Sequence, residues 1–156
     1  MSISTTTIAV DRVSILKLPF YMKGLERHDL MFTGPTKYNL LSEAYAWLFE
    51  GQEEGTVLGD NIYSFLKDSN SLPSCAGFAD LLAITKSITP DVFRRLYGEK
   101  AAIFAWRSVG RTYEDGLLRV PYVSETTIKT GNPPFWAYLS SYFSRDCPAL
   151  RFKNVE

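Results

Sequence analysis

Ten phenylalanines, nine tyrosines and three tryptophans make up 14% of this 156-residue chain. Rings of this size must be covered by a core or by an interface, because exposing them to water is unfavourable. With 46% apolar and 22% charged residues, the composition is that of a globular domain, which disfavours disorder, collagen-like repeats and coiled-coil arrays. We therefore expect residues 1–156 to form a single domain, with residues 1–8 as a flexible N-terminal arm.

Apolar spacing and turn residues predict an α+β fold, in which a small antiparallel sheet packs against four to five helices. The sheet is expected to combine N-terminal strands with a late hairpin. Strands are expected within residues 3–22 (with a bulge), 30–32, 101–109, 117–123 and 150–155. Helices are expected at 36–51, 60–68, 75–88, 90–97 and 132–147, and 75–88 suits a buried strand equally well. Two prolines, Pro19 and Pro121, predict that their strands lie at a sheet edge or end there.

Few residues of the kind that carry catalysis or bind metal are present. His28 is the only histidine, so one chain cannot build a multi-histidine metal site. Cys75 and Cys147 lack CxxC spacing and are expected to be free thiols. Neither GxxxxGK[ST] nor GxGxxG occurs. We therefore expect no catalytic residue, no cofactor and no metal, although a small hydrolase using scattered acidic residues remains an alternative.

The clearest candidate site combines basic and aromatic residues late in the chain. Arginine beside aromatic rings suits phosphate backbones with stacked bases, and it equally suits an acidic protein partner. A solvated face with ordinary salt bridges is the plain alternative. The predicted basic set is Arg94, Arg95, Lys100, Trp106, Arg107, Arg111 and Arg119.

Charge is distributed unequally along the chain despite a formal net charge of zero. Residues 1–78 hold six basic against nine acidic side chains, and residues 79–156 hold eleven against eight. Oppositely charged surfaces on one chain allow head-to-tail contact between copies. The predicted acidic set, which would form the counter-surface, is Glu43, Glu50, Glu53, Glu54 and Asp60.

These observations favour a non-catalytic protein-interaction or structural protein that binds a protein partner or itself. An RNA- or DNA-contacting module that uses the basic set is the alternative. The order of elements resembles small viral matrix proteins in architecture only, with no motif residues, and suggests a viral or mobile-element protein of matrix-like or inhibitor/adaptor-like type. Without a signal peptide, a transmembrane segment or a lipid-anchor motif, we expect a soluble protein in the cytoplasm, or in the host cytoplasm if it is viral.

Overall fold

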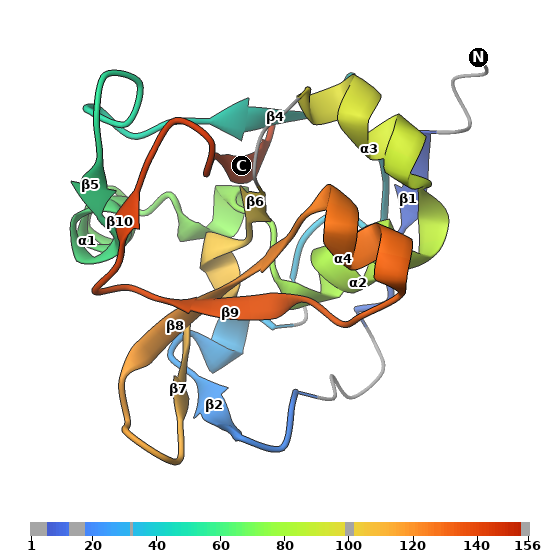
Figure 1. Cartoon of the computed structure of the whole chain (residues 1–156). Helices are drawn as coiled ribbons and strands as arrows, with labels where there is room; N and C mark the ends of the chain where they lie inside the picture. Colours follow the sequence, from blue (N-terminus) through green and yellow to red (C-terminus); the bar gives the residue numbers. More distant parts are fainter. Residues whose placement is uncertain (1–5, 13–17, 32, 99–101, 154–156) are drawn as a thin grey trace.

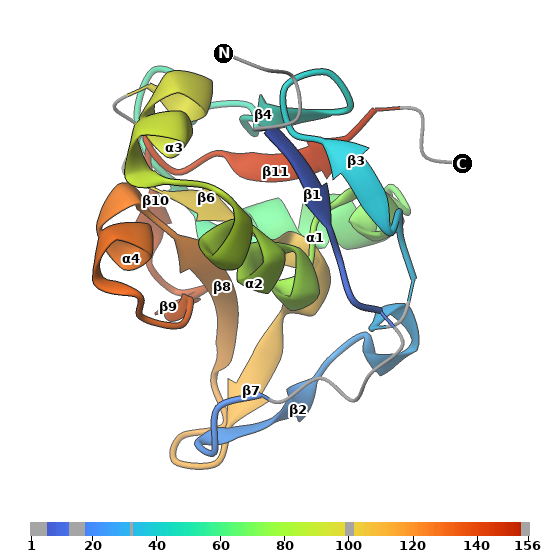
Figure 2. The ribbon, with the colours of Figure 1, turned by 90° about the vertical axis from the view of Figure 1, so that its right-hand side faces the viewer.

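The computed structural model describes residues 6–12, 18–31, 33–98 and 102–153. Within them the chain forms a mixed seven-stranded sheet with helices on both faces (Figures 1 and 2). Its strands are β2 (Met22–Leu25), β4 (Ala44–Trp47), β6 (Ile103–Phe104), β7 (Gly110–Thr112), β8 (Leu118–Val123), β9 (Phe135–Tyr138) and β11 (Ala149–Phe152). Two smaller antiparallel pairs join β1 (Thr7–Ala9) to β3 (Lys37–Asn39) and β5 (Val57–Leu58) to β10 (Tyr142–Phe143).

Strand β8 is the centre of the sheet. The order runs β2-β7-β8-β6-β11-β4, and β9 pairs with the other edge of β8. All pairs are antiparallel except β6 with β11. The α-helices are α1 (Gly59–Asp68), α2 (Phe78–Ser87), α3 (Pro90–Tyr97) and α4 (Glu125–Thr130), and short 3-10 turns are η2 (His28–Leu30), η3 (Leu72–Ser74) and η4 (Trp106–Ser108).

The side chains of the central strands alternate between two apolar cores. Ile103 and Leu150 enter a core with α2, α3, α4 and the β1–β3 pair, whereas Phe104 and Ala149 enter a core with α1, β10 and η4. Such alternation follows from the two-residue period of a strand. Figure 2 shows α2, α3 and α4 in front of the sheet and α1 behind it. The aromatic residues are therefore divided between two layers of core.

The expected fold class was wrong. We predicted a small antiparallel sheet against four to five helices, but the described residues contain a large mixed sheet and four α-helices, one of only six residues. Residues 36–51 form β3, a turn and β4 in place of a helix. The Asn39 side chain accepts hydrogen bonds from the amides of Leu41 and Ser42, which turns the chain at this point.

The predicted C-terminal helix was also wrong. Residues 132–147 contain β9 and β10, and β9 pairs with β8 over four residues. Pro121 lies inside β8, which is paired on both edges, so the edge prediction from this proline fails. The Pro121 carbonyl accepts a hydrogen bond from the Ala105 amide. Proline has no N–H to donate, but at this position its carbonyl accepts a hydrogen bond from the N–H of the residue that follows β6, so β8 can hold it.

Several local predictions agree with the structure. Helices α2 and α3 lie within the expected ranges and α1 begins one residue before its range, and the Thr89 hydroxyl accepts a hydrogen bond from the Val92 amide at the start of α3. The turn at Glu114-Asp115-Gly116 joins β7 to β8, and β11 overlaps the expected last strand. Residues 1–5 of the expected N-terminal arm lie outside the described residues, whereas β1 begins at Thr7 and pairs with β3.

A buried carboxylate, Asp80, joins three distant segments. Its oxygens accept hydrogen bonds from the Arg12 guanidinium (2.7 and 3.2 Å), the Tyr38 hydroxyl (2.7 Å) and the Gly77 amide (2.8 Å). Asp80 is fully buried and Arg12 nearly so. Burial, followed by the charge of Asp80, raises the pKa of Tyr38, so its hydroxyl stays protonated and donates. Asp80 thereby ties β3 and the N-terminal segment to the start of α2.

A second buried guanidinium, Arg107, lies next to this cluster. It donates to the carbonyls of Thr33 and Pro73, and burial lowers its pKa. Gly34 has φ +119°, and a Cβ there would lie 2.5 Å from Arg107 Nη1 and 2.8 Å from Arg12 Cζ. Only glycine fits this conformation and this space.

We predict that Asp80→Asn lowers the free energy of unfolding by about 3–5 kcal/mol, because it leaves the Arg12 charge buried without its counter-charge. Urea unfolding followed by circular dichroism measures the change. The matched control is Asp29→Asn, which removes an exposed ion pair with Arg27 and should leave the midpoint unchanged. Equal midpoints for the two variants would contradict the assigned role of Asp80.

Candidate interaction surfaces

The predicted basic set is spread over different parts of the molecule. Arg94 and Arg95 are exposed on α3, whereas Trp106 and Arg107 are buried in η4. Arg111 lies on β7, Arg119 lies on β8, and Lys100 is outside the described residues. Arg111 and Arg119 lie on adjacent strands, but Arg111 pairs with Leu118 and Arg119 with Gly110, so the structure does not gather the set on one face.

Two exposed arginines of the set, Arg94 and Arg111, have carboxylate partners. Arg94 pairs with Glu125 at 2.5 Å and with Asp91 at 3.5 Å. Arg111 pairs with Glu26 at 3.3 Å and donates to the Gly116 carbonyl at 2.7 Å.

Arg119 is occupied in a similar way. Its guanidinium stacks 3.9 Å above the Tyr138 ring and lies 3.7 Å from Asp115. These partners reduce the positive potential that the arginines present to a phosphate or to an acidic protein.

The predicted acidic set is divided among three places. Glu50, Glu53 and Glu54 are exposed in the loop between β4 and β5, and Glu43 accepts a hydrogen bond from the Asn39 amide. Asp60 lies apart from them, in the first turn of α1. Its carboxylate has no hydrogen bond or ion pair with any residue that the structure describes, which leaves an unpaired negative charge at this point.

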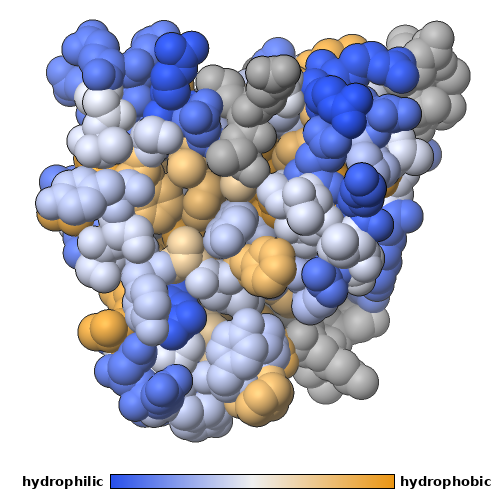
Figure 3. Space-filling view, in the orientation of Figure 1, coloured by the Kyte–Doolittle hydropathy of each residue, from blue (hydrophilic) through white to orange (hydrophobic). Residues whose placement is uncertain are grey.

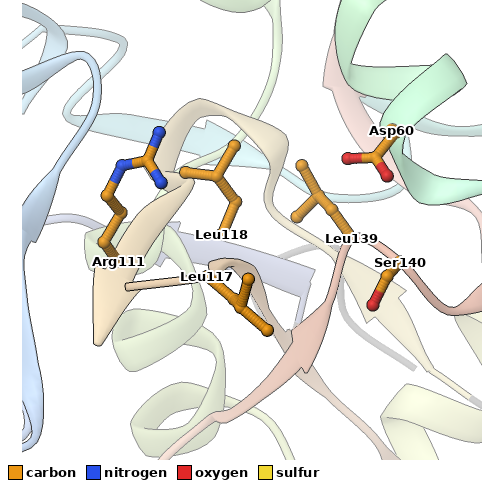
Figure 4. A pocket seen from close by; sticks show the side chains of 6 residues that line it. All are labelled: Asp60, Arg111, Leu117, Leu118, Leu139 and Ser140. Carbon is orange, nitrogen blue, oxygen red and sulfur yellow. The ribbon is translucent and has the colours of Figure 1, made fainter. Parts of the chain in front are cut away.

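Asp60 lines a pocket of about 210 Å³ between α1 and the β7–β8 hairpin. Figure 4 shows Asp60 and Arg111 on opposite sides, with leucine side chains between them and Ser140 beside Asp60. The leucines are Leu117, Leu118 and Leu139. Because Arg111 is neutralised by Glu26, the uncompensated charge in this pocket is negative.

Backbone contacts fix the position of Asp60. The amides of Gly59 and Asp60 donate to the carbonyls of Ser141 and Leu139, both at 3.0 Å. A Cβ at Gly59 would lie 2.6 Å from the Leu139 carbonyl oxygen, so glycine permits this close approach of α1 to the β9–β10 connection. The pocket is therefore built on rigid elements.

The β2–β7 pair extends from the body of the molecule (Figures 1 and 2). We call residues 19–25 and 110–118 the projection. Near its end four large apolar side chains are exposed: Phe20 (93%), Tyr21 (39%), Tyr113 (68%) and Leu117 (50%). The Tyr113 amide donates to the Tyr21 carbonyl, and the rings of Phe20 and Tyr21 are 5.6 Å apart. These four side chains form the projection tip.

The projection is anchored to the body by a third apolar cluster of Met22, Phe78 and Trp136, in which the two rings stack at 5.3 Å. The tip is thus presented on a supported element. The tip could not be predicted from the sequence, because other large apolar residues, such as Met22 and Trp136, are buried and no local pattern distinguishes them from the exposed ones. The Asp115-Gly116 turn before Leu117 did predict a hairpin here, but it did not predict which of its side chains are exposed.

Other potentially reactive residues are not brought together. His28 is exposed in η2, Cys75 is buried and Cys147 is half-buried in the loop before β11. In the part of the chain that the structure describes, no three His, Cys, Asp or Glu side chains are placed to hold a metal ion together. Among these residues, no helix has the length and apolarity that crossing a membrane requires.

Comparisons of this chain with protein-family models, with curated proteins and with solved structures find no match.

We predict that the projection loosens locally in acid. The Asp115 carboxylate accepts hydrogen bonds from the Thr112 hydroxyl (2.6 Å), the Leu117 amide (3.0 Å) and the Tyr138 hydroxyl (2.9 Å). The first two contribute most to lowering its pKa to about 2. Because folding lowers this pKa, the stabilisation is present above the ordinary aspartate pKa and is lost as the pH falls toward 2.

Amide hydrogen exchange of Gly116 and Leu117, measured by NMR between pH 5 and 2, tests this prediction. After correction for the intrinsic pH dependence of exchange, protection should fall with pH in the wild-type chain and in Glu114→Gln. In Asp115→Asn it should be low throughout. A pH-dependent loss that persists in Asp115→Asn would assign the effect to another group.

Proposed function

We propose that this chain is a non-catalytic protein that binds a polypeptide partner through the projection tip and the Asp60 pocket at its base. The observation that carries the proposal is the exposure of Phe20, Tyr21, Tyr113 and Leu117 at the end of an anchored two-stranded element. Clustered exposed apolar side chains mark interaction sites, and aromatic residues often contribute most of the binding energy there.

The charge of the pocket specifies the partner further. Leu117 belongs to both the tip and the pocket, so the two form one continuous surface. Asp60 contributes its unpaired negative charge, and Arg111 is held by Glu26. We therefore propose that the partner places a lysine or arginine beside Asp60 and an apolar side chain against the tip.

A second copy of this chain is one candidate partner, and the experiments below include it as an outcome. A nucleic-acid partner is less well supported, because Arg94, Arg111 and Arg119 would exchange bonds with their own carboxylates for bonds with phosphate.

Selection of random peptides displayed on phage against the wild-type chain tests the proposed partner chemistry. We expect enriched peptides to carry a basic residue next to an aromatic or aliphatic one. Tyr113→Ser/Leu117→Ser should weaken their binding at least thirtyfold, or about 2 kcal/mol. Asp60→Asn should weaken it about tenfold, whereas Glu53→Gln, an exposed acid outside this surface, should not.

Sedimentation equilibrium of the same variants tests whether the partner is a second copy. A wild-type dimer that becomes monomeric in the Tyr113/Leu117 variant would identify it as such. Selected peptides that bind all variants with equal affinity would contradict the proposed surface.

A further inference from the structure

A second pocket lies on the other side of the β9–β10 connection. It has a volume of about 370 Å³ and is lined by β6, β8, β9, β10 and the loop before β11. In Figure 3 apolar surface gathers in a hollow between β10 and β6. The walls include Phe104, Tyr122, Ala137 and Phe143, and Cys147 lies at one side. We call this the aromatic pocket.

Ring contacts hold the walls in place before any ligand binds. Phe104 and Tyr122 stack with centroids 4.8 Å apart and planes inclined by 28°, and Phe143 meets Phe104 edge-on at 5.0 Å. Backbone pairing of β6 with β8 and of β5 with β10 fixes the strands that carry these rings. A preformed pocket loses little conformational entropy when a ligand enters it.

The described lining offers no counter-charge to an ion. None of the described residues that line this pocket is Asp, Glu, Lys, Arg or His. An ion that entered would lose hydration without gaining a counter-charge, which costs several kcal/mol. The hydroxyls of Ser141 and Tyr142 lie on exposed residues of the lining, so a polar group of the ligand can bind near them while the rest is covered.

Size limits the ligand to a small molecule. A cavity of about 150 Å³ holds benzene, so this pocket accommodates one or two fused rings, whereas a helix needs a longer groove. We propose that the aromatic pocket binds a neutral, planar molecule of one or two rings that carries a hydroxyl or N–H group at one end. This site has no lining residue in common with the surface assigned to the polypeptide partner.

Protection of Cys147 from a thiol reagent tests the proposal directly. Cys147 is half-buried in the pocket wall, whereas Cys75 is fully buried and burial raises its pKa to about 11, so only Cys147 should react in the native chain near pH 8. Saturating 1-naphthol should slow this reaction at least fivefold. The anion 1-naphthalenesulfonate, of similar ring size, should require at least a tenfold higher concentration for the same protection.

Variants locate the binding site. Ala137→Leu fills the pocket and should weaken naphthol binding at least tenfold, as measured by protection of Cys147 and by ligand-observed NMR. Ala46→Leu, at an exposed position on β4 outside the pocket, should leave the affinity unchanged. Should Ala137→Leu not fold, Tyr142→Ala provides the second variant, since Tyr142 is 69% exposed, and it should weaken binding at least threefold.

Three results would overturn the proposal: naphthol that leaves the Cys147 reaction rate unchanged, equal protection by naphthol and the sulfonate, or equal affinities of the control and the pocket variants. Because Tyr113→Ser/Leu117→Ser leaves the aromatic pocket intact, it should bind naphthol as the wild-type chain does. Failure of one proposal is therefore distinguishable from failure of the other.

Discussion

The buried carboxylate of Asp80 is the interaction on which the arrangement of the layers depends. Four donor groups from Arg12, Tyr38 and Gly77 satisfy it in a region without access to water. A buried ion is tolerated only when its hydrogen bonds are complete, so these segments must assemble together. Ser108 also holds the start of α2, because its hydroxyl accepts a hydrogen bond from the Phe78 amide.

This use of charge explains why the predicted basic set did not become one surface. Arg107 lies in the interior and donates to two backbone carbonyls. Arg111 pairs with Glu26, which is 85 residues away in the sequence, and Arg94 pairs with Glu125, which is 31 residues away. A count of charges over a short stretch of sequence treats such arginines as unpaired. Their carboxylate partners are far away in sequence and are brought close only by the folded structure.

Local signals predicted elements whose start and stop are encoded nearby. Thr89-Pro90 at α3 and the Asp-Gly turn between β7 and β8 are examples. The two long helices predicted at 36–51 and 132–147 failed because short apolar runs fit either period, and long-range pairing decided the outcome. Trp47 faces Ala149 across the β4–β11 ladder, and Trp136 faces Pro121 across β8–β9. Neither pocket was predictable, since each collects residues from several such elements.

The two candidate binding surfaces share a wall. Leu139 and Ser140 line the Asp60 pocket, while Ala137 and Ser141 line the aromatic pocket, so a single stretch of chain separates them. The Gly59 and Asp60 amides hold this stretch against α1, and β10 holds it against β5. The surfaces nevertheless differ in chemistry, since one carries an unpaired carboxylate beside exposed apolar groups and the other is neutral and lined by rings. In the two proposals above, the β9–β10 connection, held against α1 and against β5, therefore contributes to two binding sites of different chemistry.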